Sequence, residues 1–220
     1  MSGRPMRVAF LTPEYPSETA AYGGLATYVA RMSRLLAETG HAPEVFVPAE
    51  AEGSIEHDGV KVHRVLAAKS GGPAPRLLAG LAGASRSFAL HKLASWLGQA
   101  QSLADALERR HAEAPFALVQ SADYTAPGLY VRRRPGRVHA IRCSSAADLY
   151  AATDGQLTLN HRLRGWLELT SMRRADVAYA PSRFLAEHFR SRHGMALEVV
   201  RFSALSGIRK TPPRGATVLR

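Results

Sequence analysis

The feature that most constrains the fold is a regular alternation of short apolar runs with longer stretches whose apolar residues recur at helical spacing. The apolar runs predict strands, at residues 7–12, 44–48, 59–66, 116–120, 137–142, 177–180 and 197–201. The periodic stretches predict helices, at residues 25–36, 76–111, 160–174 and 182–193. Strands that alternate with helices in this way indicate an α/β fold, a Rossmann-like, doubly wound parallel sheet.

Two glycines mark helix boundaries in this prediction. Gly40 stands where the first helix would end in a left-handed cap, and the stretch 76–111 is expected to break into two pieces near Gly98. A short helix is expected to open at residues 123–125, and residues 144–154 are expected to form a polar loop.

Ligands of such sheets bind outside the carboxyl ends of the strands. The segments that follow the strands, 13–24, 121–125, 143–148 and 181–184, are therefore the places for a site.

The composition is that of an ordinary globular domain, with 46% hydrophobic and 21% charged residues in a chain of 220. It contains no apolar run long enough for a transmembrane helix and no secretory signal, so a cytoplasmic protein is expected. Cys143 is the single cysteine, which fits a reducing compartment. His188 and His193 are five residues apart, which misses one helix face, so no metal site is predicted.

The net charge of +11 favours an anionic partner, either a phosphorylated substrate, a membrane surface or nucleic acid, but a solvated basic surface explains it equally well. No aromatic residues interleave with a basic run, so nucleic-acid binding is not predicted. The stretch 76–97 mixes leucine and aromatic residues with Arg76, Arg86 and Lys92. It could contact an anionic membrane peripherally or simply cover the sheet.

Four stretches, taken in order, resemble family 4 glycosyltransferases. They are VAFLTPEYP with the following YGGLATYVARMSRLLAETG, then ADYTAPGL, AIRCSSAADLY and RADVAYAPSRFLAEHF. The resemblance covers about residues 6 to 201 and implies the N-terminal, acceptor-side half of the GT-B fold. It further implies transfer of a hexosyl group from a nucleotide-diphosphate sugar to a carbohydrate or lipid-linked acceptor, with retention of configuration and without a cofactor.

The resemblance also implies two domains, of which residues 1–203 are the first. Residues 204–220 are expected to be a linker and the start of a second, donor-binding domain, so the chain alone is expected to be inactive. A non-catalytic or partner-dependent binding module derived from a truncated glycosyltransferase is the alternative. Glu44 and Glu52 share the spacing of two donor-domain glutamates of the family, which we interpret as coincidence. A nicotinamide or flavin enzyme is disfavoured because no G-x-G-x-x-G follows the first strand.

The resemblance and the strand ends together suggest site residues, although no catalytic residue is identified. Gly23 and Gly24 precede a helix N-terminus, where free amides favour the donor phosphates, unless they form a plain turn. Glu14 and Tyr15 follow the first strand and would line the acceptor cleft, unless they form a surface loop.

Two further strand ends complete the predicted acceptor site. Asp123 and Tyr124 are acceptor candidates, although Asp123 could equally cap a helix. Many family members have a histidine where this chain has Cys143, and a thiol cannot make the same hydrogen bonds. We favour a buried structural thiol, with Arg142 or Ser144 contacting the substrate instead.

Overall fold

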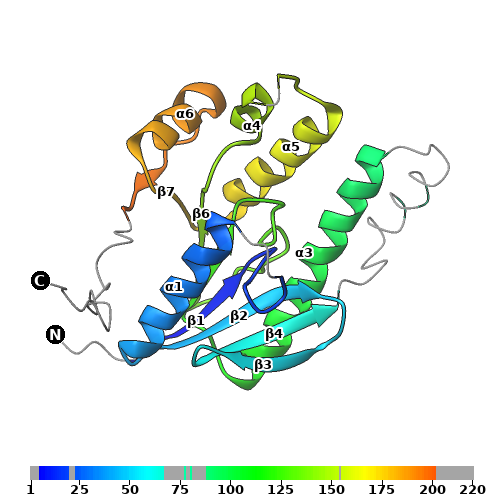
Figure 1. The fold of residues 1–220 in the computed structure, drawn as a ribbon. Helices are drawn as coiled ribbons and strands as arrows, with labels where there is room; N and C mark the ends of the chain where they lie inside the picture. Colours follow the sequence, from blue (N-terminus) through cyan, green and yellow to red (C-terminus); the bar gives the residue numbers. More distant parts are fainter. Residues whose placement is uncertain are drawn as a thin grey trace, which may run out of the picture.

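The computed structural model describes residues 5–19, 23–66, 77, 80, 88–153 and 155–201. An eight-stranded sheet forms the centre, in the order β3-β4-β2-β1-β5-β6-β7-β8 (Figure 1). The strands are β1 Arg7–Leu11, β2 Ala42–Ala49, β3 Gly53–His57, β4 Val60–Leu66, β5 Leu118–Ala122, β6 Val138–Arg142, β7 Val177–Ala180 and β8 Glu198–Val199. The helices are α1 Gly24–Glu38, α3 Phe88–Glu113, α4 Ala147–Thr153, α5 Leu159–Arg174 and α6 Arg183–His193.

The core lies on both faces of the sheet, as expected for a doubly wound fold. Alternate residues of β1 point to opposite faces. Val8 and Phe10 pack in the cluster that contains Tyr28 and Val29 of α1, whereas Ala9 and Leu11 belong to the cluster that contains residues of α3. Both faces are apolar because both are covered, so the central strands read as continuous hydrophobic runs.

The second half of the chain covers the other end of the sheet. Leu185 and Phe189 of α6 pack with Ile141 of β6, and Leu167 of α5 packs with Leu97 of α3. Figure 1 shows α4, α5 and α6 together at the top of the view. None of the helices that the structure describes is both long and apolar enough to cross a membrane.

One strand breaks the predicted parallel pattern. β3 pairs antiparallel with β4 at the edge of the sheet, and a two-residue turn of Asp58 and Gly59, both with positive φ, joins them. The sequence analysis missed β3 because its residues GSIEH are polar and largely exposed, although the Asp-Gly pair is a strong hairpin signal. Gly59, which was expected to begin the next strand, belongs to this turn.

Two helix predictions and one loop prediction are wrong within the described residues. α3 continues through Gly98 without a break, because an interior glycine costs only about 1 kcal/mol and buried neighbours such as Leu97 offset it. α4 occupies much of the expected polar loop. Residues 123–126 form a turn and not a helix, since Thr125 and Ala126 adopt positive φ. Gly40, by contrast, has the left-handed conformation predicted for the end of α1.

Some expectations fall on residues outside those described. They are most of the stretch 76–87 with its suggested membrane contact, and residues 204–220 with the suggested linker and second domain.

Candidate functional site

A polar cavity of about 590 Å³ lies at the carboxyl ends of the parallel strands. Its walls come from the loops after β1 and β6, the turn after β5, the N-terminus of α1, and helices α4 and α5. The lining residues are Glu14, Gly23, Gly24, Leu25, Tyr124, Arg142, Ser144, Ser145, Tyr150, His161 and Arg164. Six residues that the sequence analysis assigned to a site, from three strand ends, therefore face one cavity.

Arg142, the last residue of β6, is held rigidly in this wall. Its guanidinium lies 3.9 Å from the centre of the Tyr28 ring, and its Nη1 donates to the Ser144 hydroxyl at 2.9 Å. The Tyr28 hydroxyl in turn lies 3.3 Å from that of Tyr179, which donates to Gln120 at 2.9 Å. This chain of contacts links α1, β5, β6 and β7, so the cation is presented in a fixed position.

Arg164 provides a second cation from α5. Its guanidinium lies 5.2 Å from the ring centre of Tyr124 and 5.3 Å from that of Tyr150. The residue is 8% exposed, and among the described residues its Nε and Nη2 have no hydrogen-bond partner. A buried guanidinium with unused donors is costly in isolation, so it is poised to bind an anionic group.

Glu168 lies one helical turn from Arg164 and would be expected to neutralise it. The distance from Arg164 Nε to Glu168 Oε1 is 3.4 Å. However, burial raises the pKa of Glu168, and the nearby charge of Asp123 adds to this shift, which brings the pKa to about 8. The raised pKa favours the neutral carboxyl, which offsets less of the positive charge of Arg164 than a carboxylate would.

Asp123 lies behind the cavity wall and does not line it. It is 2% exposed, and its Oδ2 accepts hydrogen bonds from the backbone amides of Ser144 and Ser145 at 2.8 and 3.3 Å. Burial raises the pKa of this carboxyl. Its observed contacts position the loop after β6 that carries Ser144, so Asp123 acts on the cavity through that loop.

The glycine pair and Glu14 meet at the N-terminus of α1. Glu14 Oε1 accepts a hydrogen bond from the Ala26 amide at 3.3 Å, and a Cβ on Gly23 would lie 3.4 Å from the same oxygen. The carboxylate thus occupies part of the helix end that would favour a phosphate. Gly23 and Gly24 still line the cavity beside it.

Two predicted acceptor residues lie in the core and do not line the cavity. Tyr15 is 1% exposed, and its hydroxyl lies 3.4 Å from that of Ser33 beneath α1. Cys143 is fully buried, with its sulfur 3.8 Å from that of Met172. Burial raises the pKa of the Cys143 thiol, so it is not a nucleophile, in agreement with the interpretation of a buried structural thiol.

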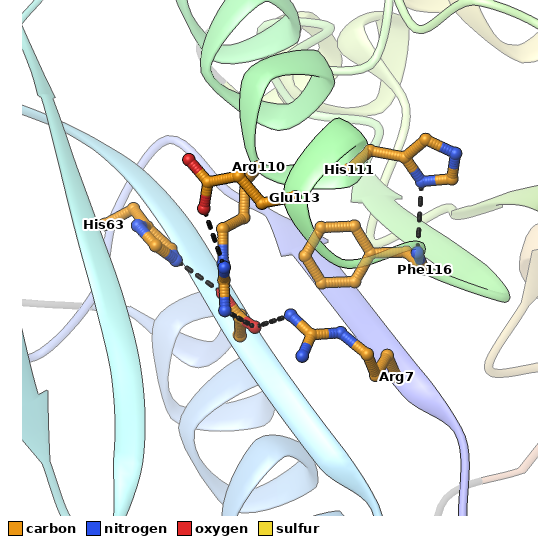
Figure 2. Close-up of polar contacts among 7 residues, drawn as sticks. Arg7, His63, Arg110, His111, Glu113 and Phe116 are labelled. Atoms are coloured by element: carbon orange, nitrogen blue, oxygen red, sulfur yellow. Dashed lines mark hydrogen bonds and ion pairs between the residues drawn. The ribbon is translucent and has the colours of Figure 1, made fainter.

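Glu44 and Glu52 form no site together. Figure 2 shows Arg7, His63 and Arg110 converging near the amino ends of the strands, where Glu44 binds all three. Glu52 is exposed and lies 3.6 Å from Arg109. The eight-residue spacing is therefore a coincidence, as interpreted, and Glu44 belongs to a structural ion-pair network away from the cavity.

Five cavity residues were not predicted from the sequence as site residues, and one of them is Leu25 of α1. Ser145 and Tyr150 lie in the segment that was interpreted as a polar loop, and His161 and Arg164 lie on α5. Arg164, Glu168 and Ser171 are buried at helical spacing on α5, but the sequence alone does not show which face of this helix is covered. A polar stripe on the covered face of a helix indicates a buried polar site.

A mostly parallel open sheet, with a cavity outside its strand ends that two arginines line, is typical of a Rossmann-like domain. The chain belongs to the glycosyl transferase 4-like family, whose model matches residues 23–203. No curated protein matches the chain in sequence.

Solved structures with the same fold are GT-B glycosyltransferases. They include Phytolacca americana apo UGT2 (TM-score 0.54, 8% identity, covering 91% of this chain and 52% of that one). O. sativa Os79 in complex with UDP matches with a TM-score of 0.52 and 13% identity, over 84% of this chain and 49% of that one. Glycyrrhiza uralensis UGT73P12 complexed with glycyrrhetinic acid 3-O-monoglucuronide matches with a TM-score of 0.51 and 12% identity, over 92% and 49%. The chain thus spans about half the length of these proteins.

Proposed function

We propose that the chain is the acceptor-side half of a retaining glycosyltransferase, which transfers a hexosyl group from a nucleotide-diphosphate sugar to a carbohydrate or lipid-linked acceptor. The family supports the reaction class. The observation that carries the proposal is the cavity at the strand ends, where Arg142 and Arg164 present two cations between aromatic rings. Two fixed cations suit a phosphorylated ligand.

The cavity residues divide into two roles in this proposal. The amides at Gly23 and Gly24 and the positive end of α1 lie beside the donor diphosphate, where glycine permits close approach. Arg142 and Arg164 stabilise the charge of the phosphate groups, and no metal ion or other cofactor is required. Tyr124, Ser144 and the second carboxylate oxygen of Glu14 contact the hydroxyl groups of the acceptor.

A second domain completes the site in this proposal. It supplies most donor contacts and joins residues 1–203 through a linker that begins near residue 204. The isolated chain therefore binds ligands but does not turn them over. A cytoplasmic location and peripheral contact with an anionic membrane also remain predictions.

Binding measurements on the chain test the role of the cavity. Isothermal titration with UDP-glucose, ADP-glucose and GDP-mannose should detect binding of at least one. Arg142→Gln or Arg164→Gln each removes a charged donor, worth about 2 kcal/mol, and should weaken that binding roughly 30-fold. Arg109→Gln makes the same charge change at a residue that is 65% exposed and outside the cavity, and should leave the affinity within about twofold.

The outcomes separate the parts of the proposal. Unchanged donor affinity in both Arg142→Gln and Arg164→Gln, or equal weakening by Arg109→Gln, would reject the cavity as the site. Release of nucleoside diphosphate by the isolated chain in the presence of acceptor sugars would reject the half-enzyme assignment. Binding without any transfer after a donor-domain partner is added would favour a non-catalytic binding module.

A further inference from the structure

Three potential metal ligands converge between α4 and α6. They are the carboxylate of Asp148, in the first turn of α4, and the imidazoles of His188 and His193 on α6. His188 Nε2 lies 3.0 Å from both oxygens of Asp148, and His193 Nε2 lies 3.6 Å from Oδ2. One ligand atom from each residue lies within 4.8 Å of the other two.

The five-residue spacing predicted that the two histidines would face different directions. In the structure the rings of His188 and His193 lie 5.7 Å apart. Both rings contact Phe189, with centroids at 6.2 and 5.4 Å. His193 is the last residue of α6, before the left-handed Gly194. Its side chain can therefore turn back toward His188, which linear spacing alone does not reveal.

The geometry suits a small transition-metal ion. Two imidazoles and one carboxylate are a ligand set typical of Zn²⁺. Tetrahedral bonds of about 2.0 Å place ligand atoms roughly 3.3 Å apart, and the observed separations of 3.0 and 3.6 Å lie on either side of that value. The side chains are partly shielded, with 31%, 14% and 21% exposure for Asp148, His188 and His193. Little movement is needed to admit an ion.

A cavity adjoins this cluster and leaves room for a fourth ligand. It has a volume of about 290 Å³, and Asp148 and His193 contribute to its wall together with the apolar side chains of Leu157, Trp166 and Phe189. The fourth coordination position of an ion at the cluster would thus face this largely apolar pocket. Such a position accommodates a water molecule or a small anionic ligand.

We propose that Asp148, His188 and His193 form a Zn²⁺ site that clamps α4 to α6. The clamp has a consequence for the functional cavity, because α4 also carries Tyr150, which lines that cavity beside Arg164. The ion would fix the position of α4 and hence of Tyr150. The site itself is independent of the proposed transferase reaction, since none of its three ligands lines the functional cavity.

Metal titration of the chelator-treated, dialysed chain tests the site. Zn²⁺ should bind with one-to-one stoichiometry in calorimetry, and Co²⁺ should give the visible absorption of a four-coordinate ion. Asp148→Asn, His188→Gln and His193→Gln should each weaken Zn²⁺ binding at least about tenfold, and the double variant His188→Gln/His193→Gln should lose the Co²⁺ bands. His41→Gln is the matched control, since His41 accepts from the Met6 amide before β1 and lies outside the cluster.

Circular dichroism shows whether each variant is folded. Asp148→Asn preserves the shape of the side chain and removes only its charge, so it is the variant least expected to disturb the fold. Zn²⁺ should also raise the Tm of the wild-type chain and of His41→Gln but not of the double variant. Absence of one-to-one binding in the wild-type chain would overturn the proposal. An unchanged Kd in the double variant would overturn it as well, because the ion would then be bound elsewhere.

Discussion

Glu44 offers the sharpest test of how buried charge stabilises this fold. Its carboxylate is 6% exposed in β2 and binds Arg7, His63 at 2.6 Å and Arg110 at 2.8 and 3.1 Å. Burial alone would raise the pKa of this group, but the hydrogen bonds from His63 and Arg110 and the charges of the two arginines outweigh it. The pKa of Glu44 is lowered from 4.5 to about 2.

The magnitude follows from the difference between these pKa values. A difference of about 2.5 pH units corresponds to about 3 kcal/mol at 25 °C. Because the folded-state pKa is the lower one, this stabilisation is fully present above pH 4.5 and is lost as the pH falls toward 2. Glu44→Gln should therefore lower the free energy of unfolding by about 3 kcal/mol at pH 7, since it leaves Arg7 and Arg110 without their buried counter-charge.

Urea unfolding followed by circular dichroism at pH 7 and pH 3 measures the effect. The gap between the wild-type chain and Glu44→Gln should shrink to about 1 kcal/mol at pH 3. Glu113→Gln is the control: Glu113 also pairs with Arg110, at 2.8 Å, but is 66% exposed, so it should cost less than about 1 kcal/mol. A loss below about 1 kcal/mol for Glu44→Gln at pH 7, or a gap that does not depend on pH, would refute the reasoning.

Three further predictions concern the interior. Gly128→Ala should destabilise the chain by about 1–3 kcal/mol in urea unfolding. The added Cβ would lie 2.2 Å from Ser121 Oγ and 2.8 Å from His139 Nε2, so these side chains would have to move. An unchanged free energy of unfolding would contradict this packing. Burial lowers the pKa of His139 from 6.5 to about 4. Between these pH values the unfolded chain binds a proton that the folded chain does not, so the free energy of unfolding should fall by up to about 3 kcal/mol as the pH drops from 6.5 to 4. His139→Gln should remove that part of the pH dependence. Cys143 should resist iodoacetamide in the native chain and react in urea, as followed by mass spectrometry; fast labelling without urea would show that the thiol is accessible.

The sequence predicted the sheet and part of the site for a physical reason. Buried parallel strands are apolar throughout, so the sequence shows where they end. Arg142 and Ser144 lie at the end of β6, and Gly23 lies in the segment between β1 and α1, so all three could be predicted. Arg164 was missed because its position depends on which face of α5 packs inward. Tyr15 was misplaced because a turn, with the Glu18 amide donating to its carbonyl at 3.0 Å, keeps its ring in the core.

The antiparallel hairpin at the β3 edge has a consequence for behaviour in concentrated solution. An exposed edge strand can pair with another copy and start aggregation. β3 presents Ser54 and Glu56 among largely exposed residues, and the tight turn at Asp58 and Gly59 limits its length to five residues. A short, polar, charged edge is a poor template for a further strand, so β3 shields the backbone edge of β4 from pairing with another copy.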